Sequence, residues 1–236
     1  MPLGSRSDDD QLRRCKKHKK LEAQLMLELP INSAFLDVGA HFGDTTITMA
    51  IHARCNGRSD LRFFAFEPDI EKCEWIKTCL FDNGLESKVT VISAAVGDSL
   101  KSVKAAEGSK KRARYDGSLV YTEGVEREEA DEEEDDYTKM IKLDSMASTI
   151  LPLGFLHLDV EGWESRALIG AKGILTATNG VCHVLAEVWD EKDCRRRKAE
   201  IIDPVSQIEA VMEEHMQFKR QDDVIDQERN LLYSAG

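Results

Sequence analysis

Four acidic residues in this sequence stand at the ends of short apolar runs. They are Asp37, Glu67, Asp159 and Glu187. Apolar runs of this length are typical of buried strands, and an open parallel sheet binds its ligand beyond the carboxyl ends of the strands. We therefore expect these carboxylates to gather at one edge of a sheet. There they could accept hydrogen bonds, move a proton or hold a metal ion.

The first two carboxylates come with a pattern that favours a nucleoside. Gly39 and Gly43 follow Asp37, permit a tight turn and lead into the N-terminus of a helix. The spacing is neither G-x-G-x-x-G nor a P-loop, so a dinucleotide or a nucleoside triphosphate fits poorly. Glu67, at the end of the second strand, is placed to accept hydrogen bonds from ribose hydroxyls. The alternatives are an ordinary strand-to-helix turn and, because Pro68 can begin a helix, an acid at a helix N-terminus.

The later carboxylates lie among other ionisable groups. His157 and Asp159 alternate along one strand and point to the same face, and Glu161 lies just beyond its end. These three are the candidates for acid–base chemistry. The alternative is that Asp159 or Glu161 caps the next helix and that His157 is a core histidine with its hydrogen bonds satisfied. Glu187, in the neighbouring strand, is a candidate wall of the site or, with Asp159, a candidate metal ligand.

Strands and helices alternate along most of the chain, which predicts a doubly wound α/β fold with a mainly parallel sheet. Helix Ile70–Phe81 is expected to bury Ile70, Cys73, Ile76 and Leu80 on one face. The charged stretch at about 98–138 is an insertion, and we expect 104–136 to be mobile because it has few apolar residues to bury. The predicted strands are Phe35–Val38, Leu61–Phe66, Val89–Val96, Lys139–Leu143, Phe155–Val160, Val181–Val188, Gln217–Gln221 and Asn230–Ser234, and the predicted helices are Leu21–Leu29, Thr45–Ala53, Ile70–Phe81, Ser165–Thr176 and Pro204–His215.

Composition narrows the class of protein further. The chain has 236 residues and a net charge of −12, and the segment 123–136 is its most acidic part. A basic surface for nucleic acid is therefore not indicated, although the acidic segment could bind a basic partner. No apolar run is long enough to span a membrane. The six cysteines show no metal-binding or disulfide pattern, which favours a soluble, cytoplasmic protein.

Residues 1–32 are expected to be separate from the catalytic domain at 33–236. They comprise an opening Met1–Ser5 that looks like the remnant of a cleaved tag, a basic arm and a short helix. A native N-terminal segment could therefore be missing.

Taken in order, the motifs resemble those of the FkbM-type S-adenosylmethionine-dependent methyltransferases. The shared patterns are Asp-Val-Gly-Ala-x-x-Gly-x-x-Thr from Asp37, Phe-Glu-Pro ending at Pro68, Asp-Val-Glu-Gly-x-Glu from Asp159 and the late Glu187. The resemblance implies a class I methyltransferase fold, which is Rossmann-like, with a seven-stranded, mainly parallel sheet and an antiparallel last strand. Family members commonly have Asn where this chain has His41 and Lys where it has His157, so both contacts could differ.

The resemblance also implies roles for individual residues. Asp159 would line the methyl-transfer site as the first choice of base, with Glu161 and His157 as reserves, or would hold a divalent cation with Glu187. The residues expected to bind S-adenosylmethionine are Asp37, Gly39, Ala40, His41, Gly43 and Thr46 for the methionine part, Glu67 and Pro68 for the ribose, and Ser93, Ala94 and Ala95 for the adenine.

The expected reaction is O-methylation of a hydroxyl on a sugar, a lipid-linked molecule or a natural product. One alternative is a catalytically weak module that binds S-adenosylmethionine and recruits a partner through the acidic segment. A nucleic-acid N-methyltransferase is disfavoured because no Asn/Asp-Pro-Pro-Tyr/Phe motif follows the strand that ends at Asp159.

Overall fold

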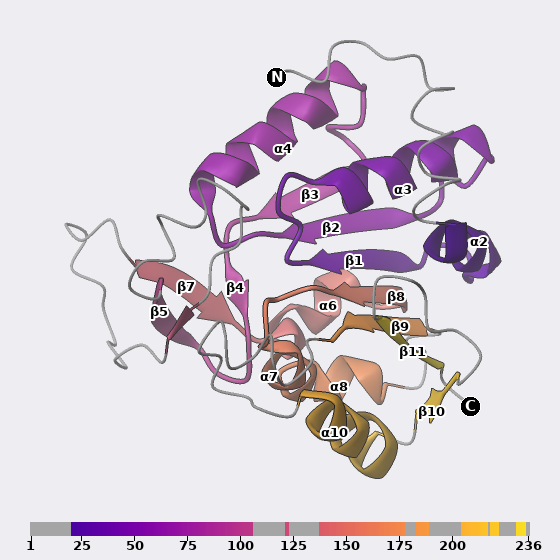
Figure 1. The fold of residues 1–236 in the computed structure, drawn as a ribbon. Helices are drawn as coiled ribbons and strands as arrows, with labels where there is room; N and C mark the ends of the chain where they lie inside the picture. Colours follow the sequence, from indigo (N-terminus) through magenta and orange to yellow (C-terminus); the bar gives the residue numbers. More distant parts are fainter. Residues whose placement is uncertain are drawn as a thin grey trace.

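A seven-stranded sheet forms the centre of the molecule (Figure 1). The computed structural model describes residues 20–105, 121–122, 137–177, 183–188, 204–216, 218–221 and 230–234. The strand order is β10-β11-β9-β8-β1-β2-β3. The strands are β1 (Ala34–Val38), β2 (Arg62–Phe66), β3 (Val89–Ile92), β8 (Leu153–Leu158), β9 (His183–Glu187), β10 (Lys219–Arg220) and β11 (Asn230–Ser234).

The direction of the strands confirms the predicted fold class. Strand β1 runs parallel to β2 and β8, and the β2–β3 and β8–β9 pairs are also parallel. The last strand, β11, lies between β9 and β10 and is antiparallel to both. The sheet is therefore mainly parallel with an antiparallel last strand, as the family resemblance implied.

Helices cover both faces of this sheet (Figure 1). One face carries α2 (Lys20–Glu28), α3 (Asp44–Cys55) and α4 (Ile70–Asp82). The other carries α6 (Ala147–Ile150), α7 (Glu164–Ile169), α8 (Lys172–Leu175) and α10 (Pro204–Glu209), which continues as a π-helix over Ala210–His215. Each layer buries an apolar face against the strands, as a doubly wound fold requires.

Two hydrophobic cores lie on opposite faces of the sheet, because successive side chains of each strand point to opposite faces. Phe35 and Phe155 point to the side of α2, α3 and α4, and their rings stack with centroids 4.9 Å apart. Leu36 and Leu156, one position later, point to the side of α7 and α10. Because successive side chains of a strand face opposite ways, one register positions both cores and the strand ends that follow them.

A second, four-stranded sheet contains parts of the predicted insertion and the chain on either side of it. Its strand order is β4-β7-β5-β6, with β4 at Ala95–Val96, β5 at Lys101–Ala105, β6 at Tyr121–Thr122 and β7 at Tyr137–Ile141. Strand β5 pairs antiparallel with β7. The end of β5 and all of β6 fall within the stretch 104–136 for which mobility was expected, and this expectation stays a prediction. The rest of the stretch, with the acidic segment, falls outside the described residues.

Other predicted elements differ in their details. The predicted strand Val89–Val96 divides after Ile92, because Ala95 and Val96 leave β2 and pair with β7 instead. The predicted helix Ser165–Thr176 divides at Gly170, where a Cβ atom would lie 1.8 Å from the carbonyl oxygen of Gly97. Ile70 is 57% exposed rather than buried, because it begins α4.

Two arginines hold the amino ends of the strands together. Arg62, which begins β2, donates from its guanidinium to the carbonyl oxygens of Thr149, Ile150 and Leu151, at 2.5 to 3.1 Å. Arg58 donates to the carbonyl oxygens of Leu27 and Leu29, at 2.7 and 2.9 Å. The two side chains thus donate hydrogen bonds to carbonyl groups at the ends of α2 and α6, which have no donor within their own helix.

None of the helices within the described ranges has the length and apolar character needed to cross a membrane.

Candidate active site

A cavity of about 280 Å³ opens at the carboxyl edge of the seven-stranded sheet. Its walls come from the loops that follow β1, β2, β3 and β8, from the first turn of α3 and from β7 of the second sheet. The volume lies near the lower end of the roughly 300–1,000 Å³ of small-molecule sites. The predicted site residues that line the cavity are Gly39, Ala40, His41, Glu67, Pro68, Ala94, Ala95, His157, Asp159 and Glu161.

The other predicted residues, among them Glu187, do not line the cavity. Asp37 is buried behind the wall, where one carboxylate oxygen accepts from the Thr46 hydroxyl at 2.5 Å and the other lies 2.9 Å from His157 Nδ1. Gly43 caps α3 and packs against Ile76, and Ser93 is exposed. Asp37 and Thr46 thus support the site from within the protein.

Gly39 is required by a close approach between two strand ends. Its φ of +89° is in the region that favours glycine, and a Cβ atom there would lie 1.8 Å from the carbonyl oxygen of Asp159. The Asp159 N–H donates to Val38 at 2.9 Å, and the Gly39 N–H donates to Phe66 at 2.9 Å. The absence of a Cβ atom at Gly39 therefore lets the loop after β1 lie against the loop after β8.

Glu67 is a buried carboxylate held by two backbone donors. The His41 N–H donates to Oε2 at 2.8 Å and the Asp69 N–H to Oε1 at 2.9 Å. His41 has a φ of +52°, a left-handed conformation that is uncommon outside glycine. Burial raises the pKa of Glu67 to about 7, although Lys72 and the two N–H groups oppose this shift. Each oxygen still has a second acceptor direction available for a ligand donor.

The N-cap residue of α4 is Asp69, which accepts from the backbone N–H groups of Glu71 and Lys72 at 2.9 and 3.3 Å. Glu67 is therefore not the cap itself, although it accepts from the N–H of the cap residue. Glu67 also lines the cavity, and its contact with a ligand stays a prediction.

Lys72 is the one cation of this wall that the sequence analysis missed. It is 6% exposed on the inner face of α4, and its ammonium lies 5.7 Å from the centre of the Phe42 ring. Its charge lowers the pKa of Glu67. A signal was present, since Lys72 lies one helical turn before the buried Ile76 and therefore on the apolar face.

Asp159 and Glu187 lie side by side, as their neighbouring strands predicted. They follow Leu158 and Ala186, which are paired in the parallel register of β8 and β9. Burial raises the pKa of Asp159 well above its usual range, and the neighbouring Glu187 carboxyl group raises it further. Asp159 Oδ1 is buried and accepts no hydrogen bond from the described part of the protein.

No third ligand joins this carboxyl pair to make a metal site. Within the described ranges, no three His, Cys, Asp or Glu side chains gather in a way that could hold an ion. A divalent cation held by Asp159 and Glu187 stays a prediction.

The loop after β8 is bent and held by a buried acid. Glu161 has a φ of +57° and Gly162 one of +96°. Glu164 Oε1 accepts from the N–H groups of Val160 and Gly162 at 3.1 and 3.2 Å, and burial raises the pKa of this carboxyl to about 7. Strained residues at a cavity indicate a functional site. Glu164 was not expected to have this structural role.

His157 combines both interpretations made from the sequence. It is buried and paired with Asp37, as a satisfied core histidine would be, and it also lines the cavity. Its role in acid–base chemistry stays a prediction.

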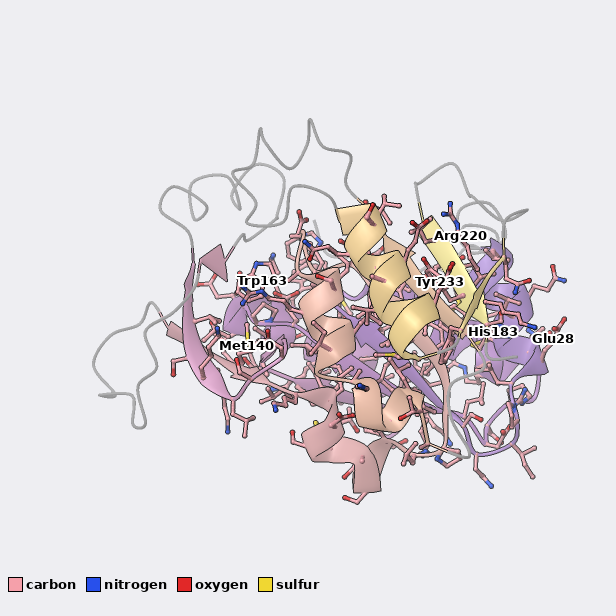
Figure 2. The ribbon with its side chains drawn as sticks, turned by 90° about the horizontal axis from the view of Figure 1, so that it is seen from below. Glu28, Met140, Trp163, His183, Arg220 and Tyr233 are labelled. Atoms are coloured by element: carbon pink, nitrogen blue, oxygen red, sulfur yellow. The ribbon has the colours of Figure 1, made fainter. Side chains whose placement is uncertain are left out.

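The second sheet closes one side of the cavity with apolar side chains. Met140 from β7 and Trp163 from the loop before α7 pack in one cluster (Figure 2). The Arg166 guanidinium lies 4.8 Å from the centre of the Trp163 ring, a distance typical of a cation–π contact. Trp163 and Met140 were not among the predicted site residues, because the pairing that brings β7 here is not local.

Several known structures match this chain at low sequence identity. A FkbM methyltransferase from Methylobacillus flagellatus KT shares 15% identity with a TM-score of 0.49; the match covers 86% of this chain but 44% of that protein. A candidate caffeoyl-CoA O-methyltransferase from Staphylococcus aureus shares 10% identity with a TM-score of 0.50, over 98% and 92% of the two chains. A SAM-dependent O-methyltransferase from Thermotoga maritima shares 14% identity with a TM-score of 0.48, over 97% and 70%. At these identities the likeness concerns the fold alone.

The sequence itself decides the family. No curated protein matches the chain. The model of the methyltransferase FkbM domain matches residues 37–229, which span the glycine turn, Glu67, the Asp159 loop and Glu187. The chain belongs to the FkbM methyltransferase family and has the class I methyltransferase fold.

Proposed function

We propose that this chain transfers a methyl group from S-adenosylmethionine to a hydroxyl oxygen of a sugar, lipid-linked or natural-product acceptor. The observation that carries the proposal is Glu67. It is a buried carboxylate in the cavity wall, fixed by two N–H groups, and α4 has its own cap in Asp69. Such a group is suited to accept hydrogen bonds from both hydroxyls of a ribose.

Other residues of the cavity wall support S-adenosylmethionine as the ligand. Ala94 and Ala95 have small side chains beside Glu67 and leave room for an adenine ring, and Gly39, Ala40 and His41 would hold the methionine part. Among the described residues, the wall carries the carboxyl groups of Asp44, Glu67, Asp159 and Glu161 against the single ammonium of Lys72, which favours a cationic ligand. When bound, S-adenosylmethionine supplies a methyl group activated by its positively charged sulfur.

The chain's own residues hold the acceptor and take up its proton. Asp159 Oδ1 lines the cavity with a lone pair that no described group uses, so it can accept a hydrogen bond from the acceptor hydroxyl. Burial and the neighbouring Glu187 raise the pKa of Asp159 above its usual range, which favours the uptake of a proton by this carboxylate. Glu161 and His157 are the other candidates at this wall. Met140 and Trp163 exclude water on the side of the second sheet.

Binding is tested by calorimetric titration with S-adenosylmethionine. Each hydrogen bond to the charged Glu67 is worth about 1.5 to 3 kcal/mol, so Glu67→Ala should weaken binding at least tenfold. The matched control is Glu71→Ala, which removes an exposed acid near the start of α4. Equal affinities in Glu67→Ala and Glu71→Ala would remove Glu67 from the binding site.

Chemistry is tested with Asp159→Asn and labelled S-adenosylmethionine. The variant keeps the shape of the side chain but loses the base, so binding should change little while methyl transfer falls at least a hundredfold. The acceptor class comes from screening extract fractions for labelled product. Tight binding with no transfer to any fraction would favour the binding module instead, and full turnover by Asp159→Asn would refute the role given to Asp159.

A further inference from the structure

A buried lysine lies in the cavity wall among acidic groups. Lys72 lines the cavity from the inner face of α4, and only 6% of it is exposed. A lysine ammonium group is almost never buried unless an anion or another acceptor lies close to it. In a ligand cavity the ligand can supply one of these acceptors, because an ammonium group has three N–H donors. Lys72 is therefore a candidate for a ligand contact.

The position of Lys72 is fixed from two sides. Its backbone N–H donates to Asp69 Oδ1 at 3.3 Å, and the Asp69 N–H donates to Glu67 Oε1 at 2.9 Å. Its ammonium nitrogen lies 5.7 Å from the centre of the Phe42 ring, within the range of a cation–π contact. The Phe42 ring meets Trp75 edge-on, with the ring centres 6.4 Å apart. The side chain is thus held at the cavity wall by contacts of both its backbone and its charged end.

Phe42 connects Lys72 with the turn that follows β1. His41, directly before Phe42, lines the cavity together with Gly39 and Ala40. This turn is expected to hold the methionine part of S-adenosylmethionine. The charged end of Lys72 therefore lies at the part of the wall where the methionine part is expected.

The methionine part carries a carboxylate, which the acids of the wall would repel. Asp44, Glu67, Asp159 and Glu161 line the cavity, whereas Lys72 is the only lysine or arginine among the described residues that line it. Charges interact more strongly where the protein excludes water, so the ligand carboxylate needs a cation within reach. The sulfonium and ammonium groups of the same ligand are suited to the acids.

We propose that Lys72 binds the carboxylate of S-adenosylmethionine and so makes the protein select ligands with an intact methionine part. The inference rests on the proposed function and adds a specificity-determining residue to it. Asp37, Gly43 and Thr46, which the family resemblance assigned to the methionine part, do not line the cavity. Lys72 provides the charged contact that these three residues do not.

Lys72 also acts on Glu67, whose pKa its charge lowers. A lysine that served Glu67 alone would affect every ligand with a ribose. A lysine that binds the ligand carboxylate affects in addition the difference between a ligand that has this group and one that lacks it. The two roles can therefore be separated by a pair of ligands.

Calorimetric titration with S-adenosylmethionine and with decarboxylated S-adenosylmethionine makes this separation. The parent should prefer S-adenosylmethionine by about tenfold or more, which corresponds to one hydrogen bond between charged groups. Lys72→Met keeps an apolar side chain of similar length but removes the charge, so it should bind the two ligands with equal affinity. Lys72→Arg keeps the charge and should retain a preference for S-adenosylmethionine.

The matched control is Lys77→Met, which removes an exposed lysine of α4 paired with Glu74 at 2.7 Å. It should keep the preference of the parent. Equal weakening of both ligands by Lys72→Met would show that Lys72 acts through Glu67 or through the fold, and unchanged affinity for both would remove it from the site. Either result overturns the inference.

The inference and the proposed function fail in different ways. A parent protein that binds both ligands equally well overturns the role of Lys72 but leaves the proposed function in place. A parent protein that binds neither ligand refutes the proposed function, and the inference with it.

Discussion

Replacing Gly39 with alanine tests whether the contact between the β1 and β8 loops builds the cavity. A Cβ atom at this position would lie 1.8 Å from the Asp159 carbonyl oxygen and 2.7 Å from its carbon. The obstructing atoms belong to the backbone, so no side chain can rotate away. An ordinary contact between such atoms is roughly 3.4 Å long, so the Asp159 loop would have to move by more than 1 Å to reach it.

The cost has two parts that a matched variant can separate. An L-residue in the left-handed region costs roughly 1 to 2 kcal/mol, and losing the Asp159-to-Val38 hydrogen bond adds roughly 1 kcal/mol, with further loss from displaced packing. We expect Gly39→Ala to lower the free energy of unfolding by about 3 kcal/mol. Gly57 has a φ of +73° but nothing within 4 Å of its Cβ position, so Gly57→Ala should cost about 1 to 2 kcal/mol through strain alone.

Urea unfolding followed by circular dichroism measures both costs, and calorimetry measures binding of S-adenosylmethionine. Gly39→Ala should weaken binding at least tenfold, because it displaces Asp159 and the turn that leads to His41. Gly57→Ala, in the turn after α3, should leave binding unchanged. Equal losses of stability in the two variants, together with normal binding by Gly39→Ala, would refute this reasoning.

Three further predictions concern ionisation, metal dependence and the acidic segment. Burial raises the pKa of Glu67 and Glu164 from 4.5 to about 7, so the folded protein holds these protons more tightly than the unfolded chain. The stability they confer is complete below about pH 4.5 and is lost as the pH rises to 7, by about 3 kcal/mol for each group. Urea unfolding between pH 4 and pH 8 measures this loss, and the free energy of unfolding of Glu164→Gln should decline less with pH than that of the parent. Methyl transfer should survive excess EDTA, and a loss that magnesium restores would instead support a cation at Asp159 and Glu187. Deleting 126–135, which contains few apolar residues, should lower the melting temperature by less than about 5 °C, and a larger drop would show that the segment contributes to the folded core.

Much of the main sheet was predictable because its signals are local. Apolar runs such as Phe35–Val38 give the strands, and the glycines and acids directly after them mark the edge where a ligand binds. The position of Glu67 at the carboxyl edge of the sheet could be predicted from this pattern alone. The pairing of Asp159 with Glu187 followed from the adjacency of two strands.

What escaped prediction depends on contacts between distant parts of the chain. His157 and Asp37 are 120 residues apart, and nothing local to either predicts their hydrogen bond. Strand β5 has Val103 as its one large apolar residue, a weak signal, and its pairing with β7 depends on residues more than 30 positions away. Glu164 looked like one more surface acid, but the bend at Glu161 brings backbone N–H groups to it.

The cavity lies at the carboxyl ends of the strands, whereas the arginine contacts stabilise the fold at their amino ends. Arg58 and Arg62 fasten chain segments to each other there, far along the strands from the cavity. Immobilisation on a solid support, or attachment of a dye or fusion partner, is therefore best made at the amino edge, where ligand entry is left clear. The same separation allows the loops of the carboxyl edge to be redesigned for other acceptors while the arginine contacts continue to hold the scaffold.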